Sequence, residues 1–324
     1  MVNFFATTAI ALGIGAWADA THNITNDWSS PQTVTFPSGD SSVVGLLYLP
    51  EIYKPNNSYP AVAVAGSFGS TKEMMSGTYA AELAKRGIIA GAIDYRNFGQ
   101  SGGAMRQYED PDSKADDLSA AVKYLSNRHD VAKTGLMGVC TSGGNVLYAA
   151  AQDRRVEALA TVVGFFQTPD VASMLLGGDE GLALRRAAGR QARKVYETTG
   201  ELQFIRQYSN STNATVNYGP APYYDSPSRG GGVRSWRNDF AVMAWEAWLS
   251  FNPVAQAPKV YTPTLMIYSE NAAFPDQARA VYDGLAGEKR TIWTNGSHYD
   301  FYDNTERVRF SADQVAVHFQ NLLA

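Results

Sequence analysis

One short segment, Gly138-Val139-Cys140-Thr141-Ser142-Gly143-Gly144, constrains the fold of this chain more than any other. It holds the only cysteine among the 324 residues, and small residues lie two positions before and two positions after that cysteine. The pattern small-x-nucleophile-x-small after an apolar strand is typical of a sharp strand-to-helix turn, because only small neighbours let the central side chain stand exposed. We therefore predict that Cys140 occupies such a turn and supports covalent acyl chemistry.

A lone cysteine is more often a small buried hydrophobic residue whose sulfur takes no part in chemistry. The flanking sequence favours the functional interpretation here. Residues 134–139 (TGLMGV) are expected to form a short buried strand and residues 145–151 the helix that follows, with glycines between them. The thiol would then lie at a helix N-terminus, where the helix dipole and free N–H groups favour the thiolate.

Ser142 is a rival nucleophile, because Cys140-Thr141-Ser142-Gly143-Gly144 also fits a small-x-Ser-x-Gly pattern. A turn centred on Ser142 would place Val139, Cys140 and Thr141 in the strand and leave Gly138 inside it, where glycine weakens pairing. The sequence therefore favours Cys140.

Length and charge limit the classes of protein that remain. A chain of 324 residues, 45% of them hydrophobic, can build one large α/β domain with an insertion, or two ordinary domains. A formal charge of −4 without a long basic run argues against a nucleic-acid partner. A single cysteine excludes intrachain disulfides and cysteine-based zinc sites, and no His, Asp and Glu cluster has ligand spacing, so we expect no metal and no cofactor.

The first twenty residues have the features of a secretory signal. Residues 4–18 are apolar but too short to span a bilayer comfortably, and Ala18-Asp19-Ala20 resembles a signal-peptidase site. No Lys or Arg precedes this stretch, so an uncleaved apolar helix in a cytoplasmic protein is the alternative. A secreted glycoprotein is the expectation, supported by five Asn-x-Ser/Thr triplets, at Asn23, Asn56, Asn210, Asn213 and Asn295.

Strand and helix patterns alternate along most of the chain. Strands are expected at residues 33–36, 43–49, 59–65, 88–94, 134–139, 156–165, 264–269 and 290–294, and helices at 72–86, 114–126 and 312–323. Such alternation predicts an α/β fold with a mostly parallel sheet and helices on both faces.

The alternation fails between about residues 166 and 259. This stretch contains two helical patterns, at 180–198 and 240–249, and a polar region at 208–232. We interpret residues 21–324 as a single domain with this stretch as a lid inserted after the sixth strand. The aromatic residues in and beside it either line a substrate pocket or, for most of them, pack the lid: Phe165, Phe166, Trp236, Trp245 and Trp248.

Four segments together resemble the α/β-hydrolase family. They are Gly66–Glu73, Asp94–Gly103, the Cys140 turn and Ser297–Asp303, in family order and at family spacing. The resemblance covers nearly everything after residue 30. It is strongest to dienelactone-hydrolase-like proteins and to fungal polyketide transferases and thiohydrolases with a cysteine nucleophile, which implies an α/β-hydrolase fold.

His298 is the candidate general base. His22 precedes the domain, His129 follows a helix, and His318 lies within the last helix. Only His298 lies in a loop just after the last expected strand, where this fold delivers its base to the nucleophile.

The acid of the triad is the uncertain member. In the family the acid lies just beyond the strand at 264–269. The corresponding position in this sequence is Ala272, whose side chain cannot orient an imidazole. Glu270 and Asp276 are the nearest carboxylates, and Glu270 is preferred because it leaves the strand end directly. Asp300 and Asp303 are further alternatives, although both lie close to the base in sequence. A Cys-His pair can also act with a weak or absent acid.

The resemblance implies an oxyanion hole made of backbone N–H groups, from Thr141 and from Ser67 or Phe68. Four charged residues also occur in segments shared with the family, and a structural ion-pair role is at least as favoured for them as a catalytic one: Arg96, Arg106, Glu109 and Asp110.

Three classes of function remain open. The first is an ester, lactone or thioester hydrolase or an acyltransferase acting on a hydrophobic small-molecule or carrier-bound acyl chain, in secondary metabolism. The second is a cyclase or carbon–carbon bond-forming or bond-cleaving enzyme using the same site. The third is a catalytically silent binding protein. The substrate and the oligomeric state are not specified by any motif.

Overall fold

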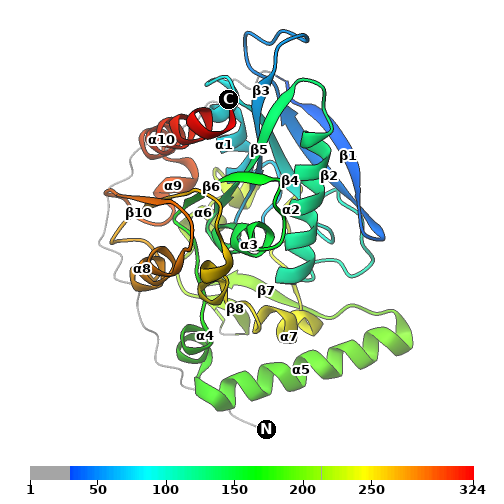
Figure 1. The fold of residues 1–324 in the computed structure, drawn as a ribbon. Helices are drawn as coiled ribbons and strands as arrows, with labels where there is room; N and C mark the ends of the chain where they lie inside the picture. The colour runs from blue at the N-terminus through cyan, green and yellow to red at the C-terminus, as the bar shows by residue number, and fades with distance from the viewer. Residues whose placement is uncertain (1–29, 213) are drawn as a thin grey trace.

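A mostly parallel eight-stranded sheet forms the centre of the computed structural model, which describes residues 30–212 and 214–324 (Figure 1). The strand order is β1-β2-β4-β3-β5-β6-β10-β11; the β1–β2 and β2–β4 pairs are antiparallel, and every later pair in this order is parallel. The strands are β1 Gln32–Ser38, β2 Ser41–Tyr48, β3 Tyr59–Ala65, β4 Ile89–Asp94, β5 Val131–Val139, β6 Val156–Val162, β10 Thr264–Tyr268 and β11 Lys289–Trp293.

Helices cover both faces of this sheet. On one side α1 packs against α10, and on the other α2 packs against α3 (Figure 1). These helices are α1 Met75–Ala84, α2 Pro111–Ser126, α3 Thr141–Ala150, α8 Pro275–Gly284, α9 Asp300–Asp303 and α10 Thr305–Leu323. The predicted fold class is thereby confirmed.

The local sequence explains the main elements. β4 is buried along its whole length, as expected for a strand inside a sheet with helices on both faces, so it is apolar from Ile89 to Ile93 and shows no alternation. α2 begins after Asp110, whose carboxylate accepts the Asp112 N–H, and Pro111 takes the first helical position, where no N–H is needed.

The stretch predicted as a lid contains its own elements, and not all of them are helical. A three-stranded sheet in the order β8-β7-β9 lies among its helices. The elements are α4 Pro169–Leu176, α5 Gly178–Thr199, β7 Phe204–Ser209, β8 Thr215–Tyr218, α6 Pro222–Asp225, β9 Phe240–Ala241, α7 Trp245–Trp248 and the 3-10 turns η1 Gly230–Gly232, η2 Val242–Ala244, η3 Pro253–Ala255 and η4 Ala257–Lys259.

One of the two helices expected in this stretch is broken. α5 matches the helical pattern at 180–198, but the second pattern, at 240–249, begins as β9, because Phe240 and Ala241 pair with β7 before the chain turns into α7. Sequence periodicity could not detect a two-residue strand that exists only through this long-range pairing. Phe166, Trp245 and Trp248 are buried in the hydrophobic core and pack the insertion.

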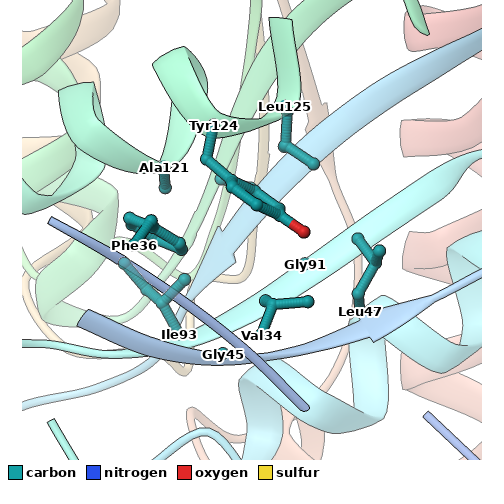
Figure 2. A pocket seen from close by; sticks show the side chains of 10 residues that line it. Val34, Phe36, Gly45, Leu47, Gly91, Ile93, Ala121, Tyr124 and Leu125 are labelled. Atoms are coloured by element: carbon teal, nitrogen blue, oxygen red, sulfur yellow. The ribbon is translucent and has the colours of Figure 1, made fainter. Parts of the chain in front are cut away.

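A small apolar cavity lies between the first strands and α2 (Figure 2). Gly91 leaves space on the sheet, because a Cβ there would meet nothing within 4 Å, and Tyr124, which stacks on Phe36 with ring centroids 5.0 Å apart, lies over it. We assign this cavity to imperfect packing, because its lining carries no group suited to chemistry.

The expected signal peptide, with Asn23, and the triplet at Asn213 lie outside the described residues. Asn56, Asn210 and Asn295 are exposed, as a glycosylation site must be. Secretion and glycosylation stay predictions. Within residues 30–212 and 214–324, no helix has both the length and the apolar character needed to cross a membrane.

Candidate active site

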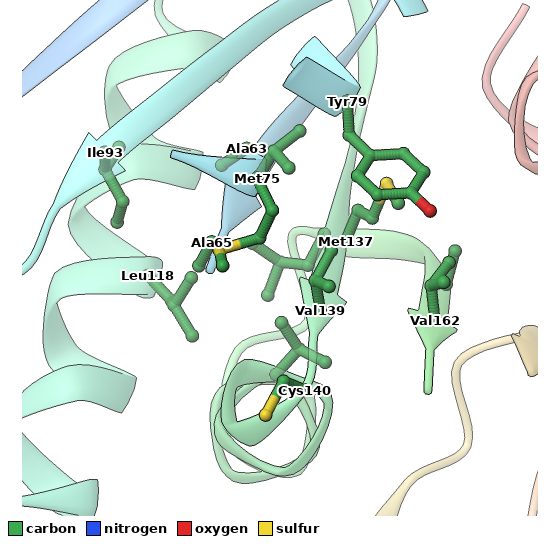
Figure 3. Close-up of a cluster of buried hydrophobic side chains, with 14 of the residues drawn as sticks. Ala63, Ala65, Met75, Tyr79, Ile93, Leu118, Met137, Val139, Cys140 and Val162 are labelled. Carbon is green, nitrogen blue, oxygen red and sulfur yellow. The ribbon is translucent and has the colours of Figure 1, made fainter. Parts of the chain in front are cut away.

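Cys140 occupies a sharp turn between β5 and α3 with an unusual backbone conformation. Its φ of 55° and ψ of −123° lie where side chains other than glycine are strained. The turn is held by main-chain hydrogen bonds, from Cys140 N to Val162 O at 3.1 Å and from Phe165 N to Cys140 O at 2.8 Å. Figure 3 shows Cys140 at the edge of the buried cluster formed by β5 and its neighbours, and its side chain is 7% exposed.

The small residues around Cys140 are required by close backbone contacts. A Cβ on Gly138 would lie 2.1 Å from the Ser142 carbonyl oxygen, and one on Gly143 would lie 2.6 Å from the Cα of Gly164. The turn therefore closes only because these positions carry no side chain.

Ser142, the rival nucleophile, lies inside α3. Its side chain is fully buried, and its hydroxyl is hydrogen-bonded to the Tyr95 hydroxyl at 2.8 Å. This arrangement gives Ser142 a structural role and leaves Cys140 at the centre of the turn.

Two of the three backbone groups considered for the oxyanion hole face the Cys140 sulfur. β3 and β5 are neighbours in the sheet, with Ala65 opposite Gly138, so the loop after β3 comes to lie beside the turn after β5. The N–H groups of Phe68 and Thr141 lie within hydrogen-bonding range of the sulfur. The Ser67 N–H is directed instead at the Met75 sulfur, 3.5 Å away.

A buried ion pair holds the loop that carries Phe68. The Gly69 N–H donates to the Glu109 carboxylate at 2.7 Å, and Glu109 forms an ion pair with Lys114 on α2. Both side chains are almost completely buried. Glu109, singled out from the sequence as structural or catalytic, is therefore a residue that positions the loop.

His298 lies in the loop between β11 and α9, beside the loop that follows β10. Its Nε2 is 3.1 Å from the Tyr302 hydroxyl, and its Nδ1 accepts a hydrogen bond from the Ala273 N–H at 3.3 Å. Burial lowers the pKa of the imidazole from its ordinary value of 6.5 to about 4. His298 is consequently neutral at pH 7.

The structure does not bring Glu270 or Asp276 to His298, which corrects the preferred assignment of the acid. The two carboxylates are 63% and 89% exposed, and both pair with Arg279 on the surface. The chain leaves β10 with Glu270 directed outward, and the backbone of Ala273 occupies the position beside Nδ1 that a carboxylate would need.

The two other carboxylates near the base are also engaged elsewhere. Asp303 forms a two-pronged ion pair with Arg229 of the insertion, with both N–O distances at 2.6 Å. Asp300 accepts the Ser297 N–H at 2.7 Å and so shapes the loop that carries His298. In the described part of the chain, His, Cys, Asp and Glu side chains form no group of three able to hold a metal ion.

Several buried tyrosines lie near the Cys140 sulfur, and the sequence analysis did not identify them. Five of them come from different parts of the chain and interact electrostatically with Cys140: Tyr208, Tyr224, Tyr268, Tyr299 and Tyr302. Tyr208 and Tyr224, both from the insertion, stack with ring centroids 3.9 Å apart, and the Tyr224 hydroxyl is hydrogen-bonded to Ser67. Only Tyr299 and Tyr302 carried a sequence signal, since both lie with His298 in the segment Ser297–Asp303.

The thiol of Cys140 is held largely in its protonated form. Burial raises the pKa of the Cys140 thiol, and hydrogen bonds from Tyr302, from the Thr141 side chain and from the N–H groups of Thr141 and Phe68 partly offset that effect. The neutral donors therefore offset only part of the cost of burying a thiolate.

Comparisons with known proteins agree with this architecture. A family model described as the alpha/beta hydrolase fold matches residues 74–305. Uncharacterized protein PA2218 of Pseudomonas aeruginosa is 30% identical over 86% of this chain and 78% of its own length. A crystal structure of the hypothetical protein PA2218 covers 94% of this chain and 100% of its own, with 26% identity and a TM-score of 0.78.

Two fungal relatives have named activities. Thiohydrolase aneE of Aspergillus aculeatus is 32% identical over 160 residues, which are 47% of this chain and 50% of aneE. Acyltransferase drtE of Aspergillus calidoustus is 24% identical over 76% of this chain and 82% of drtE. The chain therefore belongs to the α/β-hydrolase fold family and is an enzyme of its hydrolase and acyltransferase class.

Proposed function

We propose that this enzyme transfers an acyl group through a covalent thioester on Cys140. The main support is the strained turn at Cys140 together with the Phe68 and Thr141 N–H groups beside its sulfur. Two donors at that position are what a developing oxyanion requires. The names of the fungal relatives, a thiohydrolase and an acyltransferase, fit the same chemistry.

The reaction has two halves. The Cys140 sulfur attacks the carbonyl carbon of an ester, lactone or thioester, a carbon–sulfur bond forms, and the carbonyl oxygen takes up negative charge beside the two N–H groups. The bond to the leaving oxygen or sulfur then breaks, and the leaving group departs with the proton of the thiol. Water, or an alcohol or amine acceptor, releases the acyl group in the second half and restores the thiol.

The surroundings of the sulfur favour a largely apolar acyl chain. Tyrosine rings from the insertion and from the loop after β11 approach the sulfur, and such rings present apolar faces with neutral polar tips. A hydrophobic acyl chain, free or attached to a carrier, suits this environment better than a charged substrate. A role in secondary metabolism remains part of the same proposal.

The test is to trap the acyl-enzyme. After incubation with p-nitrophenyl esters of increasing chain length, mass spectrometry should find one acyl adduct per chain, on Cys140, and Cys140→Ala should abolish both adduct and turnover. Ser142→Ala is the matched control and should still form the adduct, because Ser142 is buried within α3. Full activity in Cys140→Ala would overturn the proposal.

A further inference from the structure

The peptide group that joins Ser67 to Phe68 carries the Phe68 N–H, which the proposed function places at the developing oxyanion. This peptide bond is trans and planar, so its C=O and its N–H point in opposite directions. Whatever holds the Ser67 carbonyl therefore also sets the direction of the Phe68 N–H. The register of β3 and β5, with Ala65 opposite Gly138, brings this peptide beside the Cys140 turn.

Ser70 holds the Ser67 carbonyl through two hydrogen bonds. The Ser70 N–H donates to this oxygen at 3.2 Å and closes a tight turn, and the Ser70 hydroxyl donates to the same oxygen at 2.9 Å. The two lone pairs of the carbonyl oxygen are then both occupied. Two donors fix the direction of a carbonyl more firmly than one donor does, so the hydroxyl adds to what the turn alone would provide.

The Ser70 hydroxyl is confined to this position. Its residue is 6% exposed, and a Cβ on Gly66 would lie 2.4 Å from its oxygen, which shows how closely the backbone of Gly66 approaches. A buried hydroxyl is stable only when it is hydrogen-bonded, and the Ser67 carbonyl accepts this one. The contact between Ser70 and Ser67 is therefore a fixed part of the loop.

A second hydroxyl holds the same peptide group from the insertion. The Tyr224 hydroxyl on α6 is hydrogen-bonded to the Ser67 hydroxyl, and both side chains are buried. The Tyr224 ring stacks on the Tyr208 ring of β7, with centroids 3.9 Å apart. The Phe68 ring packs against the Trp248 ring of α7, with centroids 4.6 Å apart. The insertion thus contacts the side chains on both sides of the peptide group.

We propose that Ser70 and Tyr224 are positioning residues, which hold the Ser67–Phe68 peptide so that its N–H is directed at the developing oxyanion. Both act through the peptide and not on the substrate, Ser70 at the carbonyl and Tyr224 at the Ser67 side chain. The oxyanion hole is then complete only when the insertion is docked on the loop after β3. This inference rests on the proposed acyl transfer, because only that reaction forms the oxyanion.

The test compares two reactions of one thiol, since Cys140 is the only cysteine of the chain. Acylation by p-nitrophenyl acetate places negative charge on a carbonyl oxygen. Alkylation by iodoacetamide displaces iodide from a saturated carbon and forms no oxyanion. Both reactions depend on the ionisation and the accessibility of the sulfur, so the ratio of their rates at one pH reports on the oxyanion hole.

We expect Ser70→Ala and Tyr224→Phe each to lower the rate of acylation by about tenfold, which is part of the hundredfold or more that the loss of a whole donor costs. The rate of alkylation should match wild type. Ser76→Ala is the matched control, because it removes a buried hydroxyl that has no hydrogen-bond partner among the described residues, in the neighbouring helix α1. Both rates should match wild type in that variant.

An unchanged ratio of the two rates in Ser70→Ala would overturn the inference, whether both rates stay the same or both fall together. Circular dichroism checks that this variant is folded. If it is not, an unchanged ratio in Tyr224→Phe, which keeps the ring stack with Tyr208, overturns the inference instead. The absence of an acyl adduct on Cys140 in the wild-type protein would refute the proposed function itself. An adduct that forms equally fast in wild type and in Ser70→Ala would refute only the positioning roles.

Discussion

The Ala273 N–H lies 3.3 Å from Nδ1 of His298, in the place where the sequence predicted a carboxylate. A carboxylate there would accept a hydrogen bond from Nδ1, whereas the amide N–H can only donate one. This one contact separates the site from a Cys-His-acid triad, and several of its consequences can be measured.

His298 should stay neutral through the physiological range. Its pKa is lowered by burial from 6.5 to about 4, so we expect its imidazole resonances in NMR to titrate below pH 5. Between those two pH values the unfolded chain binds more protons than the folded protein. The free energy of unfolding should therefore fall as the pH is lowered from 6.5 toward 4, by about 3 kcal/mol at most, and level off below.

The pKa of His318 is also lowered by burial, so His318 contributes to the pH dependence of the free energy of unfolding in every variant. The contribution of His298 is therefore measured as the difference between wild type and His298→Gln. His298→Gln should lose its share of the slope between pH 4 and 6.5. Identical slopes in the two proteins, or an imidazole that titrates near pH 6.5, would contradict the structure.

Glu270 and Asp276 should be dispensable. Both carboxylates are exposed and form surface ion pairs with Arg279. Because exposed ion pairs contribute little, Glu270→Gln and Asp276→Asn should each leave ester turnover within about twofold of wild type. Their free energies of unfolding should change by no more than about 0.5 kcal/mol. A loss of turnover of a hundredfold in either variant would restore that residue as the acid.

The turn at Cys140 should store backbone strain that glycine relieves. With φ at 55°, Cys140→Gly is expected to be more stable than Cys140→Ala by about 1 kcal/mol in urea unfolding. Ser142 provides the matched control, because it lies in α3, where glycine costs about 1 kcal/mol relative to alanine. The order of the glycine and alanine variants should therefore reverse between the two positions, and the same order at both would argue against strain.

The same added methyl group should stabilise the protein at Gly91 in β4 and destabilise it at Gly138 in β5. A Cβ on Gly91 meets nothing within 4 Å, so Gly91→Ala should partly fill the cavity and stabilise the protein by about 0.5 kcal/mol. A Cβ on Gly138 would lie 2.1 Å from a carbonyl oxygen, so Gly138→Ala should destabilise it by about 3 kcal/mol. Thermal unfolding of the two variants checks both signs, and a neutral Gly138→Ala would mean that the turn can relax.

Local patterns in the sequence were sufficient for the fold and for the position of the turn. The alternation of strands and helices predicted the mostly parallel sheet, and the small residues around Cys140 predicted a tight strand-to-helix turn. Both follow from short-range rules, since periodicity and backbone crowding depend on residues close together in the chain. The short strand β9 was missed because it exists only through pairing with β7.

The partners of His298 depended on how distant loops meet in space. Nothing in the sequence around Glu270 says that its side chain turns outward to Arg279 while the Ala273 amide turns inward. Likewise, Tyr208 contacts Phe68 and Tyr224 contacts Ser67, in the loop beside the Cys140 turn, only because the insertion folds back over the sheet. Side-chain chemistry is encoded residue by residue, but hydrogen-bond partners are selected by packing between elements, and packing is a property of the whole folded chain.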